Sequence, residues 1–200
     1  QLLKPPSMRY QSKINAHEIL RKAGKELKSK EPEQFKALLL ALVCGLRRGE
    51  IDNLLWEAFD FGRKVLRVQN SQYHELKSED SAGEIDLSDE MNAYFKAQAR
   101  RAKGAFVIES DHAPKKSESG TRYYRSNLVF KKLGEWLKDN GGDRKKPLHE
   151  LRKEAGSLVA AEYGIFEASR FLRHSDIRIT SQVYVDKKRR VTPSLSLASK

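Results

Sequence analysis

The chain has 200 residues, 38% of them hydrophobic and 33% charged, which suits one globular domain with a sizeable core. Lys and Arg number 39 against 27 Asp and Glu, and the net charge of +12 favours a polyanionic partner, although charge alone also fits a basic protein kept soluble by repulsion. The single cysteine, Cys44, excludes an internal disulfide, so we expect a reducing, cytoplasmic environment. The longest apolar run, residues 37–46, is too short to cross a bilayer, which argues against a membrane protein.

Helical patterns occupy the first quarter of the chain. Asn15 can cap a helix that runs to about Ser29, and Pro32 fits the first turn of a second helix that stops at Gly45. Because apolar side chains occur on nearly every side of the second helix, we expect it to be buried at the centre. A short helix over residues 48–55 is predicted to follow.

The middle of the chain changes from helical to strand periodicity. Three short strands are predicted, over residues 65–68, 73–77 and 83–87. Ser88 then opens another helix, and the stretch 110–120, rich in Ser, Lys and Pro, is predicted to be an exposed loop. Helical patterns return over residues 128–137, 148–163, 165–172 and 175–184. The predicted fold class is α+β, mainly α with a small three-stranded antiparallel sheet.

Five residues at particular spacings suggest chemistry on a phosphodiester. Arg47 follows a glycine break at the start of a helix, where free N–H groups and the helix dipole favour a phosphate. His149 and Arg152, three residues apart on a predicted helix, project from one side at the rim of its apolar stripe. His174 precedes a plausible N-cap, and Tyr184 lies late in the last helix. Singly, each has an ordinary structural explanation, so the joint order and spacing carry the interpretation.

These residues lie in segments that resemble the tyrosine recombinases, or phage integrases, over residues 13–186. The segments that resemble the family's first, second, third and nucleophile boxes are residues 41–51, 149–152, 172–177 and 180–184, respectively. The resemblance implies the catalytic-domain fold of the DNA breaking-rejoining enzymes. It also implies a set of catalytic residues: Arg47, Lys77, His149, Arg152, His174 and Tyr184.

The chain also departs from the family pattern at some positions. The family has a lysine on a strand-to-strand turn, and Lys77 falls at that place, with Lys64 in the same sheet region as an alternative. Arg173 stands where relatives usually carry Gly, and Lys153 stands where a second histidine or arginine is common. Neither departure removes a catalytic group, but Arg173 bears on how the last helices pack.

The resemblance implies a reaction in which Tyr184 attacks a DNA phosphate, forms a 3′-phosphotyrosyl link and releases a 5′-hydroxyl. Arg47 and Arg152 would neutralise the charge that grows on the non-bridging oxygens, and His174 would donate a hydrogen bond. His149 would accept the tyrosine proton or orient the phosphate, and Lys77 would protonate the departing 5′-oxygen. A second 5′-hydroxyl then attacks the link, so bond energy is conserved and no cofactor is expected.

Other chemistries lack their motifs. His149 and Glu150 would begin a zinc-protease motif, but Lys153 stands where its second histidine belongs, so no metal site is predicted. Two other functions stay open. A type IB topoisomerase would use the same groups without a second DNA site, and a catalytically silent DNA-binding module would lose nothing on Tyr184→Phe.

We expect three parts in the chain. Residues 1–12 resemble the end of a linker from an N-terminal DNA-clamping domain, residues 13–186 form the catalytic domain, and residues 187–200 are a tail that either frays or docks onto a neighbouring subunit. The expected partners are double-stranded DNA and further copies of the chain, assembled as dimers or tetramers on paired sites. The expected location is a prokaryotic cytoplasm, at the nucleoid, with no membrane partner.

Overall fold

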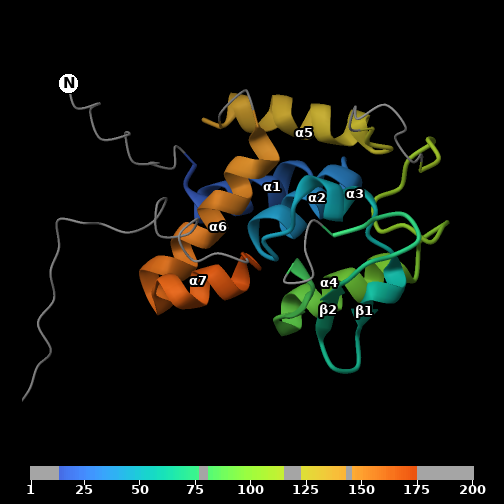
Figure 1. Ribbon diagram of the computed structural model, residues 1–200. Coiled ribbons are helices and arrows are strands. Elements are labelled where there is room, and N and C mark those ends of the chain that lie inside the picture. The colour runs from blue at the N-terminus through green and yellow to red at the C-terminus, as the bar shows by residue number, and fades with distance from the viewer. Residues whose placement is uncertain (1–13, 77–80, 115–122, 143–145, 175–200) are drawn as a thin grey trace, which may run out of the picture.

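The computed structural model of the chain describes residues 14–76, 81–114, 123–142 and 146–174. Its helices are α1 (Ala16–Glu26), α2 (Pro32–Leu42), α3 (Arg48–Asp52), α4 (Asp89–Ala99), α5 (Asn127–Asp139), α6 (Pro147–Tyr163) and α7 (Ile165–Phe171). Its strands are β1 (Phe59–Asp60), β2 (Val65–Val68) and β3 (Gly83–Asp86), and a 3-10 turn, Trp56–Ala58, precedes β1. In Figure 1, α1 to α3 lie between α5 on one side and the sheet with α4 on the other. The predicted fold class is confirmed.

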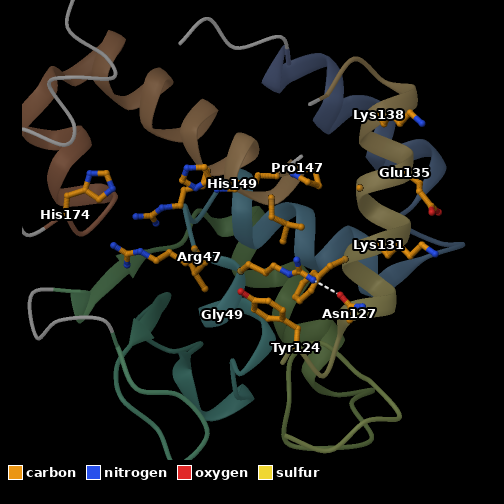
Figure 2. A pocket seen from close by; sticks show the side chains of 17 residues that line it. Arg47, Gly49, Tyr124, Asn127, Lys131, Glu135, Lys138, Pro147, His149 and His174 are labelled. Carbon is orange, nitrogen blue, oxygen red and sulfur yellow. Dashed lines mark hydrogen bonds between the residues drawn. The ribbon is translucent and has the colours of Figure 1, made fainter. Parts of the chain in front are cut away.

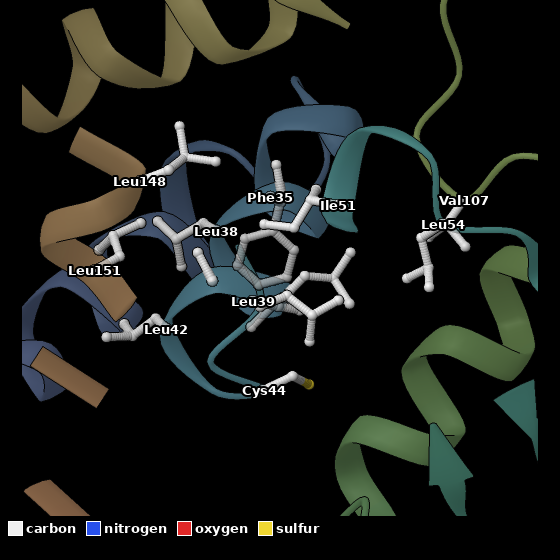
Figure 3. Packing of buried hydrophobic residues seen from close by; sticks show 14 of the residues in the cluster. Phe35, Leu38, Leu39, Leu42, Cys44, Ile51, Leu54, Val107, Leu148 and Leu151 are labelled. Atoms are coloured by element: carbon white, nitrogen blue, oxygen red, sulfur yellow. The ribbon is translucent and has the colours of Figure 1, made fainter. Parts of the chain in front are cut away.

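Helix α2 is the centre of the core, as its sequence predicts. Every residue from Gln34 to Leu42 is buried, and Figure 3 shows Leu38 and Leu42 facing Leu148 and Leu151 of α6. Each aliphatic side chain of this kind stabilises the fold by roughly 1.5–3 kcal/mol when fully buried. The packing of α6 on α2 therefore fixes where the first turns of α6 lie relative to the end of α2.

The predicted helix starts are confirmed at both early helices. The Asn15 side chain accepts a hydrogen bond from the backbone N–H of Glu18 at 3.1 Å, and Pro32 occupies the first turn of α2. Helix ends are less well predicted, since α1 ends at Glu26 and α3 ends at Asp52. At the end of α3, the Asp52 carboxylate accepts hydrogen bonds from the backbone N–H groups of Arg125 and Ser126, in the segment that leads into α5.

The sheet is antiparallel with the order β1-β2-β3, and Leu66 pairs with Phe59 on one side and Ile85 on the other. The predicted strand over residues 73–77 is wrong for the described residues 73–76. Ser71 and His74 close a turn, and the Asn70 side chain accepts a hydrogen bond from the Leu76 N–H at 2.8 Å, which folds the segment into a loop. The third strand is β1 instead.

Several expectations fall on residues outside the described ranges. They concern the linker over residues 1–12, the last helix over residues 175–184 and the tail over residues 187–200. Among the described residues, no helix is long and apolar enough to cross a membrane.

Candidate phosphodiester-binding site

A cavity of about 950 Å³ opens between α5, the start of α6 and the turn that leads into α3. Four of the predicted site residues line it, namely Arg47, His149, Arg152 and His174. Figure 2 shows Arg47, His149 and His174 on one side of this cavity and residues of α5 on the other. The two other predicted residues, Lys77 and Tyr184, lie outside the described residues.

Arg47 is placed by a turn that ends α2. Gly45 takes a left-handed conformation with φ of 60°, which favours glycine, and the Leu46 N–H then donates to the Leu40 carbonyl at 2.9 Å. Arg47 is the N-cap of α3, and its backbone N–H and Nη1 donate to the two carboxylate oxygens of Glu50, both at 2.7 Å. The backbone N–H of Arg47 is therefore not free to bind a phosphate, because it already donates to Glu50.

Arg152 lies deeper than Arg47. Its residue is 4% exposed, whereas the Arg47 side chain is 32% exposed. The guanidinium of Arg152 donates to the carbonyl oxygens of Gly45 and Leu172, and it still forms part of the cavity wall. Arg152 thus links the turn after α2 to the end of α7. The backbone just before Arg47 and the backbone just before His174 are both bonded to this one side chain.

The two histidines lie near several positively charged side chains. Burial, followed by the charges of Arg152, Arg47 and Arg173, lowers the pKa of His174 to about 4. His149 is exposed in the cavity mouth, and partial desolvation with the charges of nearby lysines and arginines lowers its pKa as well. Both imidazoles are therefore neutral near pH 7, so each can accept a proton or hydrogen bond at one ring nitrogen and donate at the other.

The rest of the cavity lining is also basic. Arg48, at the start of α3, stacks over the Tyr124 ring at 4.0 Å and donates to the Asn127 side chain at 2.7 Å. The other charged residues of the lining are Lys131, Glu135 and Lys138 of α5 and Lys146, which precedes α6. A cavity lined by several arginines and lysines suits a polyanionic backbone better than a small neutral ligand.

The sequence did not reveal the pairing of two charged residues behind the cavity wall, Glu50 and Arg173, although Arg173 stands out in it as a departure from the family pattern. Glu50 bonds Arg47 and also forms an ion pair with Arg173, whose Nη2 lies 2.7 Å from Glu50 Oε2. The spacing of Glu50, three residues after an N-cap at a helix start, is the signal that could have identified it. The pairing of Arg173 has no sequence signal, because 123 residues separate it from Glu50.

Two other residues named in the sequence can be compared with the geometry. Cys44 is buried in the core (Figure 3), and this burial raises the pKa of its thiol to about 12. Lys64, the alternative to Lys77, lies on the turn between β1 and β2 and pairs with Asp89, and it does not line the cavity. Among the described residues, no group of three His, Cys, Asp or Glu side chains is placed to hold a metal ion.

Solved structures share this fold at low sequence identity. The Tn1549 transposon integrase bound to circular intermediate DNA has a TM-score of 0.64 and 18% identity, over 90% of this chain and 64% of that one. XerA recombinase has a TM-score of 0.62 and 16% identity, over 92% of this chain and 62% of that one. Lambda integrase, solved as a tetramer bound to a Holliday junction, has a TM-score of 0.61 and 20% identity, over 94% of this chain and 51% of that one. The chain thus spans between about half and two-thirds of the length of these three proteins.

Comparison with curated proteins gave no match. The model of the phage integrase family, in contrast, matches residues 12–190, which include all four boxes identified in the sequence. This match covers most of the chain, and the fold agrees with it. The chain therefore belongs to the phage integrase family.

Proposed function

We propose that the chain is the catalytic domain of a site-specific DNA recombinase that cuts and rejoins double-stranded DNA through a phosphotyrosyl link. One observation carries the proposal. Segments about a hundred residues apart in the sequence bring Arg47, Arg152, His149 and His174 to one basic cavity. Two guanidinium groups and two neutral imidazoles are a suitable set for holding the non-bridging oxygens of a phosphodiester.

The burial of each group supports a distinct role. Arg47 is partly exposed and would grip the phosphate directly, while the deeper Arg152 would bond the phosphate from behind and keep the two boxes together. His149, neutral at pH 7, would accept the proton of the Tyr184 phenol or orient the phosphate, and His174 would donate a hydrogen bond. Lys77 would protonate the departing 5′-oxygen.

The proposed reaction needs no external source of energy. The phenol oxygen of Tyr184 forms a bond to phosphorus as the bond from phosphorus to the 5′-oxygen breaks, and the 5′-oxygen takes up a proton. A 5′-hydroxyl from a partner strand then reverses this step at a new junction. The number of phosphoester bonds does not change, so we propose that no nucleotide and no metal takes part.

Assembly on DNA is part of the same proposal. Lambda integrase forms a dimer on a core site and a tetramer on a Holliday junction. We propose that copies of this chain likewise assemble as dimers and tetramers on paired sites, in a prokaryotic cytoplasm. The basic walls of the cavity support DNA as the partner.

Covalent trapping tests the proposal. Labelled duplex with the junction sequences of the encoding element is incubated with the full-length protein and with its Tyr184→Phe variant, then separated on a denaturing gel. We expect a retarded, protease-sensitive band with the wild-type protein and none with the variant. No band with either protein, despite binding to the duplex, would favour a silent DNA-binding module.

Two further assays on the same preparation separate the enzyme classes. A recombinase should need a second matching site before strands exchange, and it should leave plasmids without a site supercoiled. Relaxation of such plasmids at a rate similar to that of site-containing plasmids would indicate a topoisomerase of type IB instead.

A further inference from the structure

Arg173, which directly follows the C-cap of α7, has a backbone conformation that residues other than glycine rarely adopt. Its φ is 50°, in the left-handed region. The Arg173 N–H donates to the Arg170 carbonyl at 2.9 Å, and the His174 N–H donates to the Ser169 carbonyl at 3.0 Å. These two bonds are those of a helix end whose left-handed position is usually a glycine. A large charged residue at this position therefore calls for an explanation from its side chain.

The side chain of Arg173 is buried and paired. Its Nη2 lies 2.7 Å from Glu50 Oε2, and the two side chains are 5% and 3% exposed. The same Glu50 carboxylate accepts two hydrogen bonds from Arg47, one from its backbone and one from its Nη1. The Arg173 carbonyl accepts another from Arg47 Nη2 at 3.2 Å. The acceptors of the Arg47 guanidinium are thus Glu50, which Arg173 holds, and the backbone of Arg173 itself.

A third contact links Arg173 to the sheet. The Cδ of Arg173 lies 3.4 Å from where a β-carbon on Gly83 would be, so its methylenes pass close over β3. Strand β3 follows the segment that carries Lys77. The Arg173 side chain therefore contacts both β3 and α3, and the next residue in the chain is His174. Arg173 itself is not among the residues that line the cavity.

Stability alone explains this arrangement poorly. Removing two charges from water offsets much of what a buried ion pair contributes, so such pairs are weak evidence for stability. A left-handed arginine adds a backbone cost that glycine would avoid. What the pair does supply is a fixed position for the Glu50 carboxylate, and hence for the fork of Arg47, which faces the cavity.

We propose that Arg173 is a positioning residue for strand cleavage, which holds Glu50 and through it orients the Arg47 guanidinium toward the scissile phosphate. This inference rests on the proposed function. The charge balance supports it: burial alone would raise the pKa of Glu50, but the charge of Arg173 and the hydrogen bonds from Arg47 outweigh it and hold that pKa below its ordinary value. The carboxylate that holds Arg47 is therefore ionised at neutral pH.

The test uses Arg173→Gly, which relieves the left-handed backbone and removes only the side chain. Arg63→Gly is the control, because Arg63 is an exposed basic residue on the turn between β1 and β2 that pairs with Glu84 and does not line the cavity. Covalent-complex formation is measured at saturating DNA and well below the melting temperature of each variant. We expect Arg173→Gly to slow cleavage by about ten- to a hundredfold, as a misplaced catalytic group does, while Arg63→Gly cleaves like the wild type.

Two variants show whether Arg173 acts through Arg47. Arg173→Lys keeps the charge beside Glu50, so it should restore part of the rate that Arg173→Gly loses. In a double-mutant cycle, Arg47→Lys combined with Arg173→Gly should cleave no more slowly than Arg47→Lys alone, since the positioned group is already impaired. Additive losses, an Arg173→Lys variant as slow as Arg173→Gly, or a normal rate in Arg173→Gly would each overturn the inference.

A readout without cleavage keeps this inference separate from the proposed function. In side-chain NMR of the wild-type protein, the Arg47 guanidinium should show slow rotation about its Cζ–Nη bonds because both ends are held. Arg173→Gly should make that rotation fast, and unchanged slow rotation would contradict the inference. Absence of any covalent complex with the wild-type protein would instead count against the proposed function, whatever the NMR result.

Discussion

Arg47 and Arg152 differ in burial, and this difference predicts different consequences of their loss. Arg47 is partly exposed and its acceptors are Glu50 and the Arg173 carbonyl, whereas Arg152 donates to two main-chain carbonyls inside the protein. A guanidinium that bonds main chain on both sides has a structural role as well as a place in the cavity wall. Mutations at the two positions should therefore separate phosphate binding from folding.

Arg47→Ala and Arg152→Ala should each slow DNA cleavage by roughly a hundred- to a thousandfold, as removal of one charge-stabilising donor does. Only Arg152→Ala should also lower the free energy of unfolding strongly, by about 1–3 kcal/mol for each buried carbonyl left without its donor. Single-turnover cleavage and urea unfolding measure the two effects. Normal cleavage by either variant while bound to its site would refute the assignment of that arginine.

His174 predicts a pH dependence of stability. Its folded pKa of about 4 lies below the ordinary value of 6.5, so between these values the unfolded chain binds the proton more strongly than the folded one. The free energy of unfolding should therefore fall as the pH falls through this range, and His174→Gln should show a shallower fall. Urea unfolding at about pH 5 and about pH 7 compares the two proteins. Equal falls in both would show that His174 is not held neutral by its surroundings.

At the residue scale, the sequence predicted the groups that line the cavity better than the groups that support them. Arg47, His149, Arg152 and His174 were predicted from their boxes and do converge. The ion pair between Glu50 and Arg173 was not predicted, because a pairing between residues far apart in the chain depends on how α3 and α7 pack. The effect of a residue on helix packing can be suspected from sequence, but its partner cannot.

At the scale of elements, the turn after α2 is tightly constrained. A β-carbon on Gly45 would lie 2.8 Å from Phe171 Cε1, and its φ of 60° is left-handed. Gly45→Ala should therefore lower the free energy of unfolding by about 2–4 kcal/mol, from backbone strain and overpacking together. Gly24→Ala is the matched control, since nothing lies within 4 Å of a β-carbon there and alanine favours the helix.

Urea unfolding of the two glycine variants decides the point. We expect a lower midpoint for Gly45→Ala and an unchanged or higher midpoint for Gly24→Ala. A Gly45→Ala protein as stable as the wild type would mean that the turn and Phe171 adjust freely, and the position of Arg47 would then not depend on this turn.

The helices were predicted well from sequence, and the sheet less well. Capping residues and apolar periodicity are local signals, so the starts of α1 and α2 and the burial of α2 follow from them. The error over residues 73–76 arose because Tyr73 and its neighbours have strand propensity, while the structure uses Tyr73 to pack on the Phe106 ring, 5.0 Å away. The two residues of β1 are too few to show a period.

For the whole molecule, the positive charge predicts how DNA binding responds to salt. If the full-length protein contacts about six to ten phosphates, its affinity should fall by about 10³ to 10⁵ between 50 and 200 mM salt. Lys131→Gln, on the α5 wall of the cavity, should reduce the salt slope by about one, and Lys96→Gln on α4 should not. Fluorescence anisotropy over a salt series measures both, and equal slopes for the two variants would place the DNA elsewhere.

The most direct test identifies the protein atom that becomes linked to DNA. Covalent complexes of the full-length protein with junction duplex are digested with protease and nuclease, and the nucleotide-bearing peptide is sequenced by mass spectrometry. We predict a single modified residue, Tyr184, joined through its phenol oxygen to a 3′-phosphate. A nucleotide on any other side chain, or a 5′-phosphate link, would contradict it.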